Sequence, residues 1–231
     1  MSKRGIFIVI DGSDGAGKST QYAKLCERIK DEGIELETIK FPQYKQPSAY
    51  FIEQYLQWHY GQADDVPAKR TSVLFAVDRF AAAQHIRERL EQGVAVIADR
   101  YVVANMGLQG AKMDNPDERH EFFRWLDEFE YTIMGIPRPD INIVLSVSVE
   151  QTARNMTKRT AESDHPSDVH EANPDFLRRS VEVYHEICEL FPDQYHRIDC
   201  MQDETSMLPV DVIHNQIWEF VGAKLQKGIS S

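Results

Sequence analysis

A run of eight residues near the start of the chain has the composition and spacing of a phosphate-binding site. It reads Gly12-Ser13-Asp14-Gly15-Ala16-Gly17-Lys18-Ser19, which fits the pattern of a glycine, any four residues, and then Gly-Lys-Ser. Glycines reach backbone conformations that other residues resist, so successive N–H groups can point at phosphate oxygens beside a helix N-terminus. In such loops the lysine reaches the β- and γ-phosphates, and the serine hydroxyl binds Mg²⁺. The residues expected to hold a nucleoside triphosphate are Gly12, Gly15, Ala16, Gly17, Lys18, Ser19 and Thr20.

The surroundings of this loop support the assignment. Average residue usage makes a chance match on the order of one in a hundred for a chain of this length. The apolar run Ile6–Ile10 before the loop is typical of a buried strand, and an amphipathic helix is predicted after it, over about 18–32. Asp14 places a carboxylate where anions should bind, so it needs a metal, a cation or a hydroxyl donor as partner. For Asp11, a functional role and a polar strand end are equally good interpretations.

Two further pairs of residues suit nucleotide chemistry. Phe75 and Arg79 are four residues apart in a predicted helix and so share a face, where a ring can stack on a base and a guanidinium can grip a phosphate. Taken alone, a helical aromatic is more often part of the core. Asp99 and Arg100 follow the apolar run Val94–Ala98. A carboxylate there can serve Mg²⁺ through water and an arginine can bridge two phosphates; a local ion pair is the alternative.

A basic stretch later in the chain is a candidate lid. Arg154, Lys158 and Arg159 precede the polar run Ser163-Asp164-His165-Pro166. A lid that brings positive charge to a transferred phosphoryl group has this composition, and so does a solvated loop. We expect a short lid at about residues 154–172.

The elements that must position these residues alternate between strand and helix. Strands are predicted at Ile6–Ile10, Glu35–Phe41, Val94–Asp99, Ile141–Val147 and Tyr195–Cys200. Helices are predicted over about 18–32, with Gly33 as the stop, and over about 68–92, 116–131, 174–191 and 209–225. This order predicts an α/β fold with a parallel sheet, whose ligands bind at the carboxyl ends of the strands. Asp11, Phe41 and Asp99 stand at such ends.

Composition limits the classes of function. The net charge of −11 argues against nucleic-acid polymers as partners, since these need basic patches. The longest apolar runs are too short to span a bilayer, and the first five residues have no signal-peptide anatomy, so no membrane partner is expected. The three widely spaced cysteines are best explained as buried free thiols of a cytoplasmic protein. No linker or repeat divides the chain, which predicts a single domain over residues 1–231.

From about Gly5 to Phe191 the chain resembles the thymidylate kinase family. The order and spacing of the shared blocks are more specific than the phosphate loop alone. Those blocks are Gly12–Thr20, Phe41-Pro42, Leu74-Phe75 through Arg79, Asp99-Arg100-Tyr101, Gln109-Gly110-Ala111-Lys112 and Pro137-Arg138-Pro139-Asp140. The resemblance implies a three-layer P-loop NTPase fold with a five-stranded parallel sheet flanked by helices, and a homodimer packed through long helices. It also implies ATP as the phosphoryl donor, dTMP as the acceptor and Mg²⁺ as the cofactor.

The resemblance also assigns roles to individual residues. In this family the carboxylate matching Asp14 lies near the 3′-hydroxyl of the acceptor sugar, and the aromatic matching Phe75 stacks on thymine. Arginines matching Arg79 and Arg100 hold the base or the acceptor phosphate, and polar residues matching Asn105 and Gln109 face the base. We therefore expect two sets of residues. The catalytic set is Lys18, Asp14, Arg100 and Arg159, with Ser19 and Asp99 serving the metal. The substrate set is Asp14, Phe41, Phe75, Arg79, Arg100, Asn105 and Gln109.

Three departures from the family pattern concern the phosphates. The family often has an arginine just after the Phe-Pro pair, where this chain has Gln43-Tyr44-Lys45; Lys45 is a candidate substitute without bidentate geometry. The serine expected five residues after Asp99 is Ala104. One subgroup carries an arginine inside the phosphate loop, where this chain has Gly15 and Ala16, so the catalytic cation is expected in the lid.

The predicted reaction is transfer of the γ-phosphoryl group of ATP to dTMP, giving dTDP and ADP. The acceptor phosphate is already ionised near neutral pH, so positioning and charge neutralisation suffice. The nearest alternative is a deoxynucleoside kinase, which should place a carboxylate where this chain has Lys40-Phe41-Pro42-Gln43. Another nucleoside monophosphate kinase is a further alternative. A GTPase switch would carry an Asn-Lys-x-Asp motif, which the sequence lacks, and a catalytically silent ATP-binding protein would release no ADP in response to an acceptor.

Overall fold

Five parallel strands form the centre of the fold. The structure is a computed structural model that describes residues 4–162, 169–170 and 173–229. The strand order is β2-β3-β1-β4-β5. The bounds are β1 Phe7–Gly12, β2 Leu36–Lys40, β3 Ala95–Asp99, β4 Ile141–Ser146 and β5 His196–Asp199. The three middle strands are buried throughout, as continuous apolar runs in a parallel sheet must be. The predicted five-stranded parallel sheet is confirmed.

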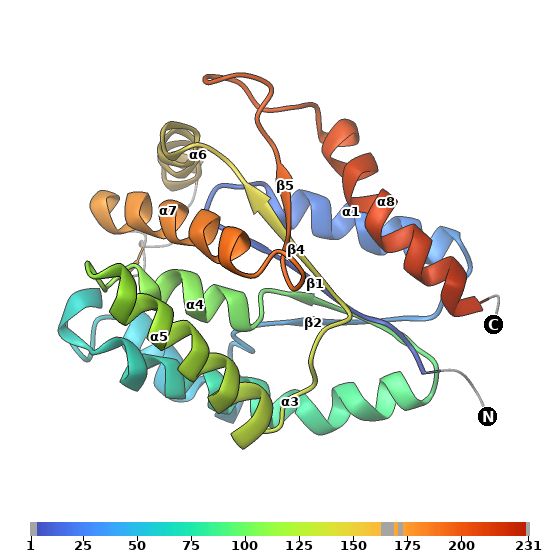
Figure 1. The fold of residues 1–231 in the computed structure, drawn as a ribbon, viewed down its shortest axis with the longest axis horizontal. Coiled ribbons are helices and arrows are strands. Elements are labelled where there is room, and N and C mark those ends of the chain that lie inside the picture. The colour runs from blue at the N-terminus through green and yellow to red at the C-terminus, as the bar shows by residue number, and fades with distance from the viewer. Residues whose placement is uncertain (1–3, 163–168, 171–172, 230–231) are drawn as a thin grey trace.

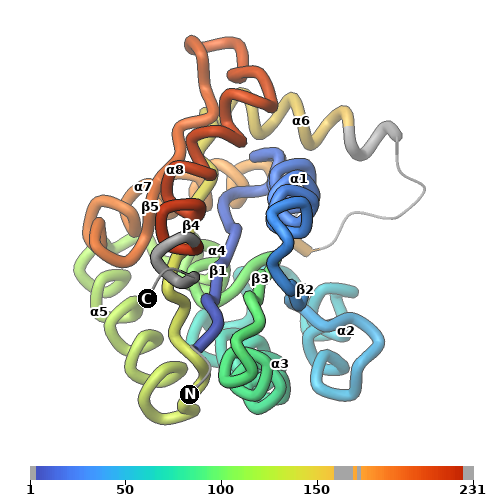
Figure 2. Tube along the Cα trace, turned by 90° about the vertical axis from the view of Figure 1, so that its right-hand side faces the viewer, coloured from blue at the N-terminus to red at the C-terminus, as the bar shows by residue number. Residues whose placement is uncertain are grey.

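Helices cover both faces of the sheet (Figures 1 and 2). The α-helices are α1 Lys18–Asp31, α2 Tyr50–Leu56, α3 Ala68–Glu91, α4 Val102–Gly110, α5 Pro116–Asp127, α6 Val149–Glu162, α7 Pro174–Leu190 and α8 Val210–Ile229. Alternate residues of β1 point to opposite faces. Ile8 and Ile10 pack in the core beneath α1 and α8, whereas Phe7 and Val9 pack in the core formed with α3, α4, α5 and α7. The predicted α/β layers flanking the sheet are therefore confirmed.

Local signals in the sequence account for several helix ends. Gly33 follows α1 with φ 74°, a conformation that glycine adopts without strain. The Asn115 side chain accepts hydrogen bonds from the backbone N–H groups at the start of α5, and Asn173 caps α7 in the same way. Each cap is followed by a proline at the first helical position, which has no N–H to satisfy.

The chain after α5 differs from the predicted helix over 116–131. The α-helix ends at Asp127 and continues as a π-helical segment, η3, over Glu128–Ile133. One extra residue in a helical turn rotates the residues that follow it, and here Glu130 is fully buried. The helices α2, α4 and α6 were also not predicted. Ser163 to Pro166 of the candidate lid lie outside the described residues.

Candidate active site

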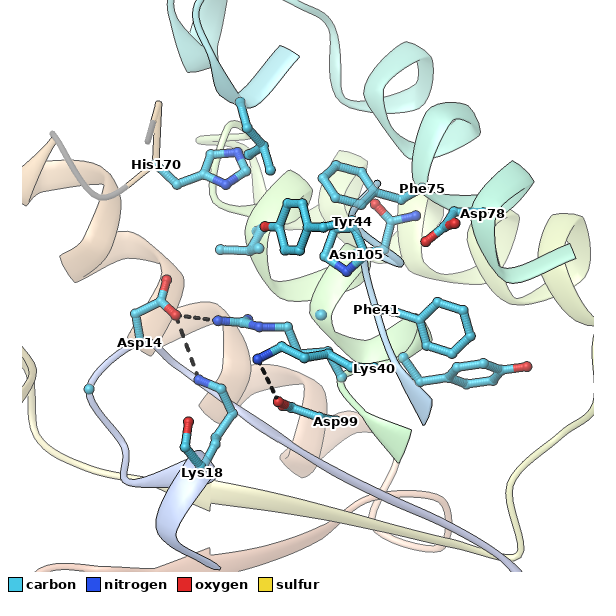
Figure 3. A pocket seen from close by; sticks show the side chains of 18 of the residues that line it. Asp14, Lys18, Lys40, Phe41, Tyr44, Phe75, Asp78, Asp99, Asn105 and His170 are labelled. Carbon is cyan, nitrogen blue, oxygen red and sulfur yellow. Dashed lines mark hydrogen bonds and ion pairs between the residues drawn. The ribbon is translucent and has the colours of Figure 1, made fainter. Parts of the chain in front are cut away.

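A cavity of about 730 Å³ opens at the carboxyl ends of β1, β2 and β3. The phosphate loop and the start of α1 form one side, and α3 and α4 form the other (Figure 3). The predicted site residues in its wall are Asp14, Gly15, Gly17, Lys18, Ser19, Thr20, Phe41, Phe75, Arg79, Asp99, Arg100, Asn105 and Gln109. Gly12 and Ala16 are buried and do not line the cavity. The side chain of Arg159 lies outside the described residues.

The phosphate loop is held by its own lysine. Lys18 Nζ donates hydrogen bonds to the carbonyl oxygens of Gly12 at 3.0 Å and Ser13 at 2.7 Å. Gly15 and Gly17 adopt φ values of 78° and 82°, which explains why glycine recurs here. A side chain at Gly12 would meet the Leu145 carbonyl oxygen of β4 at 2.3 Å. Burial, together with the nearby Arg100 guanidinium, lowers the pKa of Lys18 to about 8.

Asp14 lies between two cations. Arg100 Nη2 donates a hydrogen bond to Asp14 Oδ1, and Lys18 Nζ is 3.6 Å from the same oxygen (Figure 3). Burial by itself would raise the pKa of Asp14, but the charges of Arg100 and Lys18 together hold it well below its usual value. The carboxylate therefore stays ionised, and it meets the cationic partners that its position in the loop requires.

Asp11 anchors the turn that carries Arg100. Its carboxylate accepts hydrogen bonds from the backbone N–H of Gly12 and of Tyr101, and from the Tyr184 hydroxyl at 3.0 Å. Burial raises its pKa. Of the two interpretations of Asp11, its fully buried position and these partners favour a structural one. Arg100 has a left-handed φ of 68°, which this anchoring maintains. Its buried Nη1 has no hydrogen-bond partner among the described residues, so it can serve a ligand.

Oxygen groups suited to Mg²⁺ are few at this site. Ser19 is exposed in the cavity wall, and the buried Asp99 carboxylate pairs with Lys40 Nζ at 3.2 Å. Within the described ranges, no group of three or more His, Cys, Asp or Glu side chains could hold a metal ion. Mg²⁺ bound to a nucleotide usually takes one or two protein oxygens and completes its shell with phosphates and water. Ser19 and Asp99 fit that pattern.

The side of the cavity away from the phosphate loop combines rings with unpaired amides. Phe75 of α3 is partly exposed, while Phe41 is buried and packs on Tyr101 with ring centroids 5.5 Å apart. Gln109 is fully buried, and neither of its amide atoms has a hydrogen-bond partner in the described part of the chain. Buried amides without partners are costly, so a polar ligand is expected to satisfy them.

Arg79 also lines the cavity, but its charge is already balanced. Its Nε and Nη2 donate to the two carboxylate oxygens of Glu130, each at 2.5 Å. The Coulomb attraction of Glu130 raises the pKa of Arg79 despite the opposing effect of burial. A phosphate beside Arg79 would meet a neutralised guanidinium, whereas a base would meet a fixed planar donor. The resemblance left both options open, and this pairing favours the base.

Four residues in the wall were not among the predicted site residues: Lys40, Tyr44, Asp78 and His170. Lys158, one of the predicted lid cations, also lines the cavity. His170 Nε2 lies 2.9 Å from the Tyr55 hydroxyl and 115 residues away from it in sequence, so no local pattern could pair them. Asp78 accepts hydrogen bonds from the Gln43 backbone and the Ser48 hydroxyl, which fixes the loop after β2. Lys45, the candidate substitute for the missing arginine, is exposed, and Lys40 stands in the wall.

These features define a class of protein. A phosphate loop between β1 and α1 shares one cavity with an aromatic and amide surface on α3 and α4, which is the arrangement of a P-loop kinase that acts on a small nucleotide. The family model described as thymidylate kinase matches residues 10–212. The chain belongs to the thymidylate kinase family, which confirms the predicted family and the predicted class of enzyme, a P-loop kinase of nucleotide biosynthesis.

Individual relatives agree with this membership. A thymidylate kinase of Mycobacterium tuberculosis is 32% identical over 79% of this chain and 85% of its own length. The human thymidylate kinase is 32% identical over 66% of each chain. A solved structure of a thymidylate kinase from Candida albicans has a TM-score of 0.72 and 24% identity, covering 99% of this chain and 95% of that one. At that identity the structural likeness shows the fold, and it confirms the predicted P-loop NTPase architecture.

Proposed function

We propose that this chain transfers the γ-phosphoryl group of ATP to the 5′-phosphate of dTMP, giving dTDP and ADP. The observation that carries this proposal is the two-sided cavity. Lys18 and the loop glycines lie on one side. Phe75 lies on the other, together with the unpaired amide oxygen of Asn105 and the unpaired amide group of Gln109. A nucleoside monophosphate in this cavity can place its base against α3 and α4 and its phosphate toward the loop.

On the donor side, backbone N–H groups of the phosphate loop and Lys18 are proposed to bind the phosphates of ATP. The loop amides and the start of α1 would hold the β- and γ-phosphates, and Lys18 would leave the Gly12 and Ser13 carbonyls to meet them. Ser19 would hold Mg²⁺, with Asp99 acting through water. When bound, this ion would neutralise charge on the phosphates.

The acceptor side is proposed to align the two phosphates. Phe75 would stack on the base, with Phe41 behind it in the wall. Asp14 would take the 3′-hydroxyl of the sugar. Arg100 would turn its unpartnered Nη1 to the acceptor phosphate, which attacks as an oxyanion and requires no general base. Arg79, Asn105 and Gln109 would contact the base.

A lid cation is proposed to complete the charge neutralisation. Lys158 of α6 lines the cavity, whereas Arg154 is exposed and donates to Gln151 and to the Thr205 carbonyl oxygen. Arg159 remains the other candidate. Comparing alanine variants at 154, 158 and 159 by kcat should identify the acting residue. We also propose that residues 1–231 act as one domain, with this segment as its lid.

The test is turnover of ATP with a panel of nucleoside monophosphates and Mg²⁺. We expect dTMP to be phosphorylated, and Lys18→Ala to abolish this activity while the protein remains folded. Intact turnover in Lys18→Ala would refute the scheme. Thymidine assayed in parallel separates a deoxynucleoside kinase, the alternative function. The end of β2 argues against that alternative, because Lys40 and Phe41 occupy the place of its catalytic carboxylate.

A homodimer and a cytoplasmic location are also proposed. Val73, Val77 and Phe80 recur at helical spacing on the outer face of α3, and all three are exposed. Ala82 and Ala83 are buried in the core, so the contact face would be built from the exposed stripe. Cys26, Cys188 and Cys200 are free thiols, as expected in a reducing compartment. Within the described residues, no helix is long and apolar enough to cross a membrane.

A further inference from the structure

Glu130 is a buried carboxylate that does not line the cavity but touches two residues that do. It lies in the π-helical segment Glu128–Ile133, and single π-helical turns often occur at functional sites. Its two oxygens accept from Arg79, and Oε1 also accepts from Asn105 Nδ2 at 3.0 Å. Three N–H groups, two from Arg79 and one from Asn105, donate to Glu130, so its carboxylate fixes the orientation of both side chains in the cavity wall.

The effect on Asn105 is to fix the direction of its amide. Asn105 Nδ2 donates to Glu130 and to the Ser72 carbonyl oxygen at 3.2 Å. Turning the amide over would set its oxygen against two acceptors, so only one orientation is stable. Asn105 Oδ1 is thereby left buried and without a hydrogen-bond partner in the part of the chain that the structure describes. Asn105 stands near Phe75 in the cavity (Figure 3).

A fixed, unpaired acceptor beside a stacking ring selects bases by hydrogen-bond polarity. Thymine and uracil carry a ring N3–H, which can donate to Asn105 Oδ1. Cytosine carries an unprotonated N3, which would oppose that oxygen with a second acceptor. A site that accepts a hydrogen bond from a ring N–H discriminates strongly against a base without that N–H, because the acceptor of the site, here Asn105 Oδ1, is then left unpaired.

We propose that Glu130 is a positioning residue for base selection: it holds Asn105 with its oxygen toward the cavity and so restricts the acceptor to imide bases. This inference rests on the proposed function, since it concerns the base of the same nucleoside monophosphate. Glu130 itself does not touch the substrate. A carboxylate is needed because N–H groups face both of its oxygens: Arg79 Nε donates to Oε2, and Arg79 Nη2 and Asn105 Nδ2 donate to Oε1. An amide has one accepting oxygen, so its NH2 group would face one of these donors.

The experiment compares dTMP with 5-methyl-dCMP, which has the same size and methyl group but the opposite polarity at N3. We expect Glu130→Gln to lower the ratio of kcat/KM for dTMP to that for 5-methyl-dCMP at least tenfold. When the NH2 group of the glutamine takes the place of Oε1, it can donate to Asn105 Oδ1, and Asn105 Nδ2 then turns toward the base. Glu128→Gln, an exposed residue of the same segment, is the matched control and should leave the ratio unchanged.

The ratio separates a selective role from a merely structural one. Both acceptors are assayed in one preparation, so partial unfolding lowers both values equally and cancels. A ratio within twofold of the wild type in Glu130→Gln, or an equal fall in Glu128→Gln, would overturn the proposal. Equilibrium Kd values for the two monophosphates provide a second reading. Failure of the wild type to phosphorylate dTMP would refute the proposed function, while the Kd ratio would still decide the role of Glu130.

Discussion

Replacing Asp14 with asparagine should destabilise the ligand-free protein and also enlarge its stabilisation by ATP. Asp14 is buried, 3.6 Å from Lys18 Nζ and hydrogen-bonded to Arg100. At that separation two unit charges attract by roughly 4–5 kcal/mol if the effective dielectric constant is about 20. The cavity is open to water and the neutral variant avoids the cost of burying a carboxylate, so we expect a net loss of about 3 kcal/mol. For a chain of this length, that corresponds to a fall in Tm of roughly 6–12 °C.

The variant should have a lower Tm than the wild type without ligand but a larger rise in Tm with ATP, and a general loss of stability would not produce both changes. Without Asp14, the charges of Lys18 and Arg100 face each other unbalanced, and the phosphates of ATP supply the missing negative charge. Thermal unfolding with and without a non-hydrolysable ATP analogue should therefore show a lower Tm but a larger ligand-induced rise in Asp14→Asn than in the wild type. Asp114→Asn, an exposed aspartate, is the control. An unchanged Tm, or a ligand shift no larger than that of the wild type, would refute the electrostatic reasoning.

Three other predictions test separate parts of the structure. The pKa of Lys18 is about 8 in the free protein, and bound phosphates raise it, so ATP binding above pH 8 should be accompanied by proton uptake. As the pH rises above 8, the Kd for ATP should therefore increase by up to about tenfold per pH unit. Titration calorimetry in buffers of different ionisation enthalpy measures this uptake, and proton release would contradict it. Gly107→Ala places a methyl group 2.6 Å from the Tyr184 ring and should lower the free energy of unfolding by about 1–3 kcal/mol. Denaturant titration measures this change, and a stabilised variant would show that α4 and α7 can move apart without cost. Phe80→Asp puts a charge on the exposed stripe of α3 and should convert a dimer to a monomer in light scattering, so a wild type that is already monomeric excludes the dimer proposal.

Local pattern was sufficient for the phosphate side of the site. The loop from Gly12 to Ser19 could be recognised because its function requires contiguous residues, and the strand before it and helix after it have distinct periodicities. Gly33 was predicted as the stop of the first helix for the same reason, and the helix starts at about residues 116 and 174 were also located. The edge strand β2, which is only half-buried, was also located within a residue or two of its ends.

Contacts between distant segments could not be predicted in this way. Arg79 meets Glu130 across 51 residues of sequence, and His170 meets Tyr55 across 115. Glu130 was not singled out from the sequence, because no local pattern shows that a glutamate of this segment is buried. The roles of Arg79 and Asp11 were open for the same reason: each depends on which partner the fold brings to the side chain.

Local sequence patterns predict the layered α/β fold and the loop expected to bind a triphosphate, because hydrophobic periodicity and the glycine pattern extend over a few neighbouring residues. Tertiary structure alone decided the electrostatic state of the site. Packing of α3, α4 and η3 neutralises Arg79 and fixes the amide of Asn105, and the close approach of Lys18 and Arg100 keeps Asp14 ionised. Charges and amide orientations depend on distances of a few ångströms between residues far apart in the chain, and only the folded protein sets those distances.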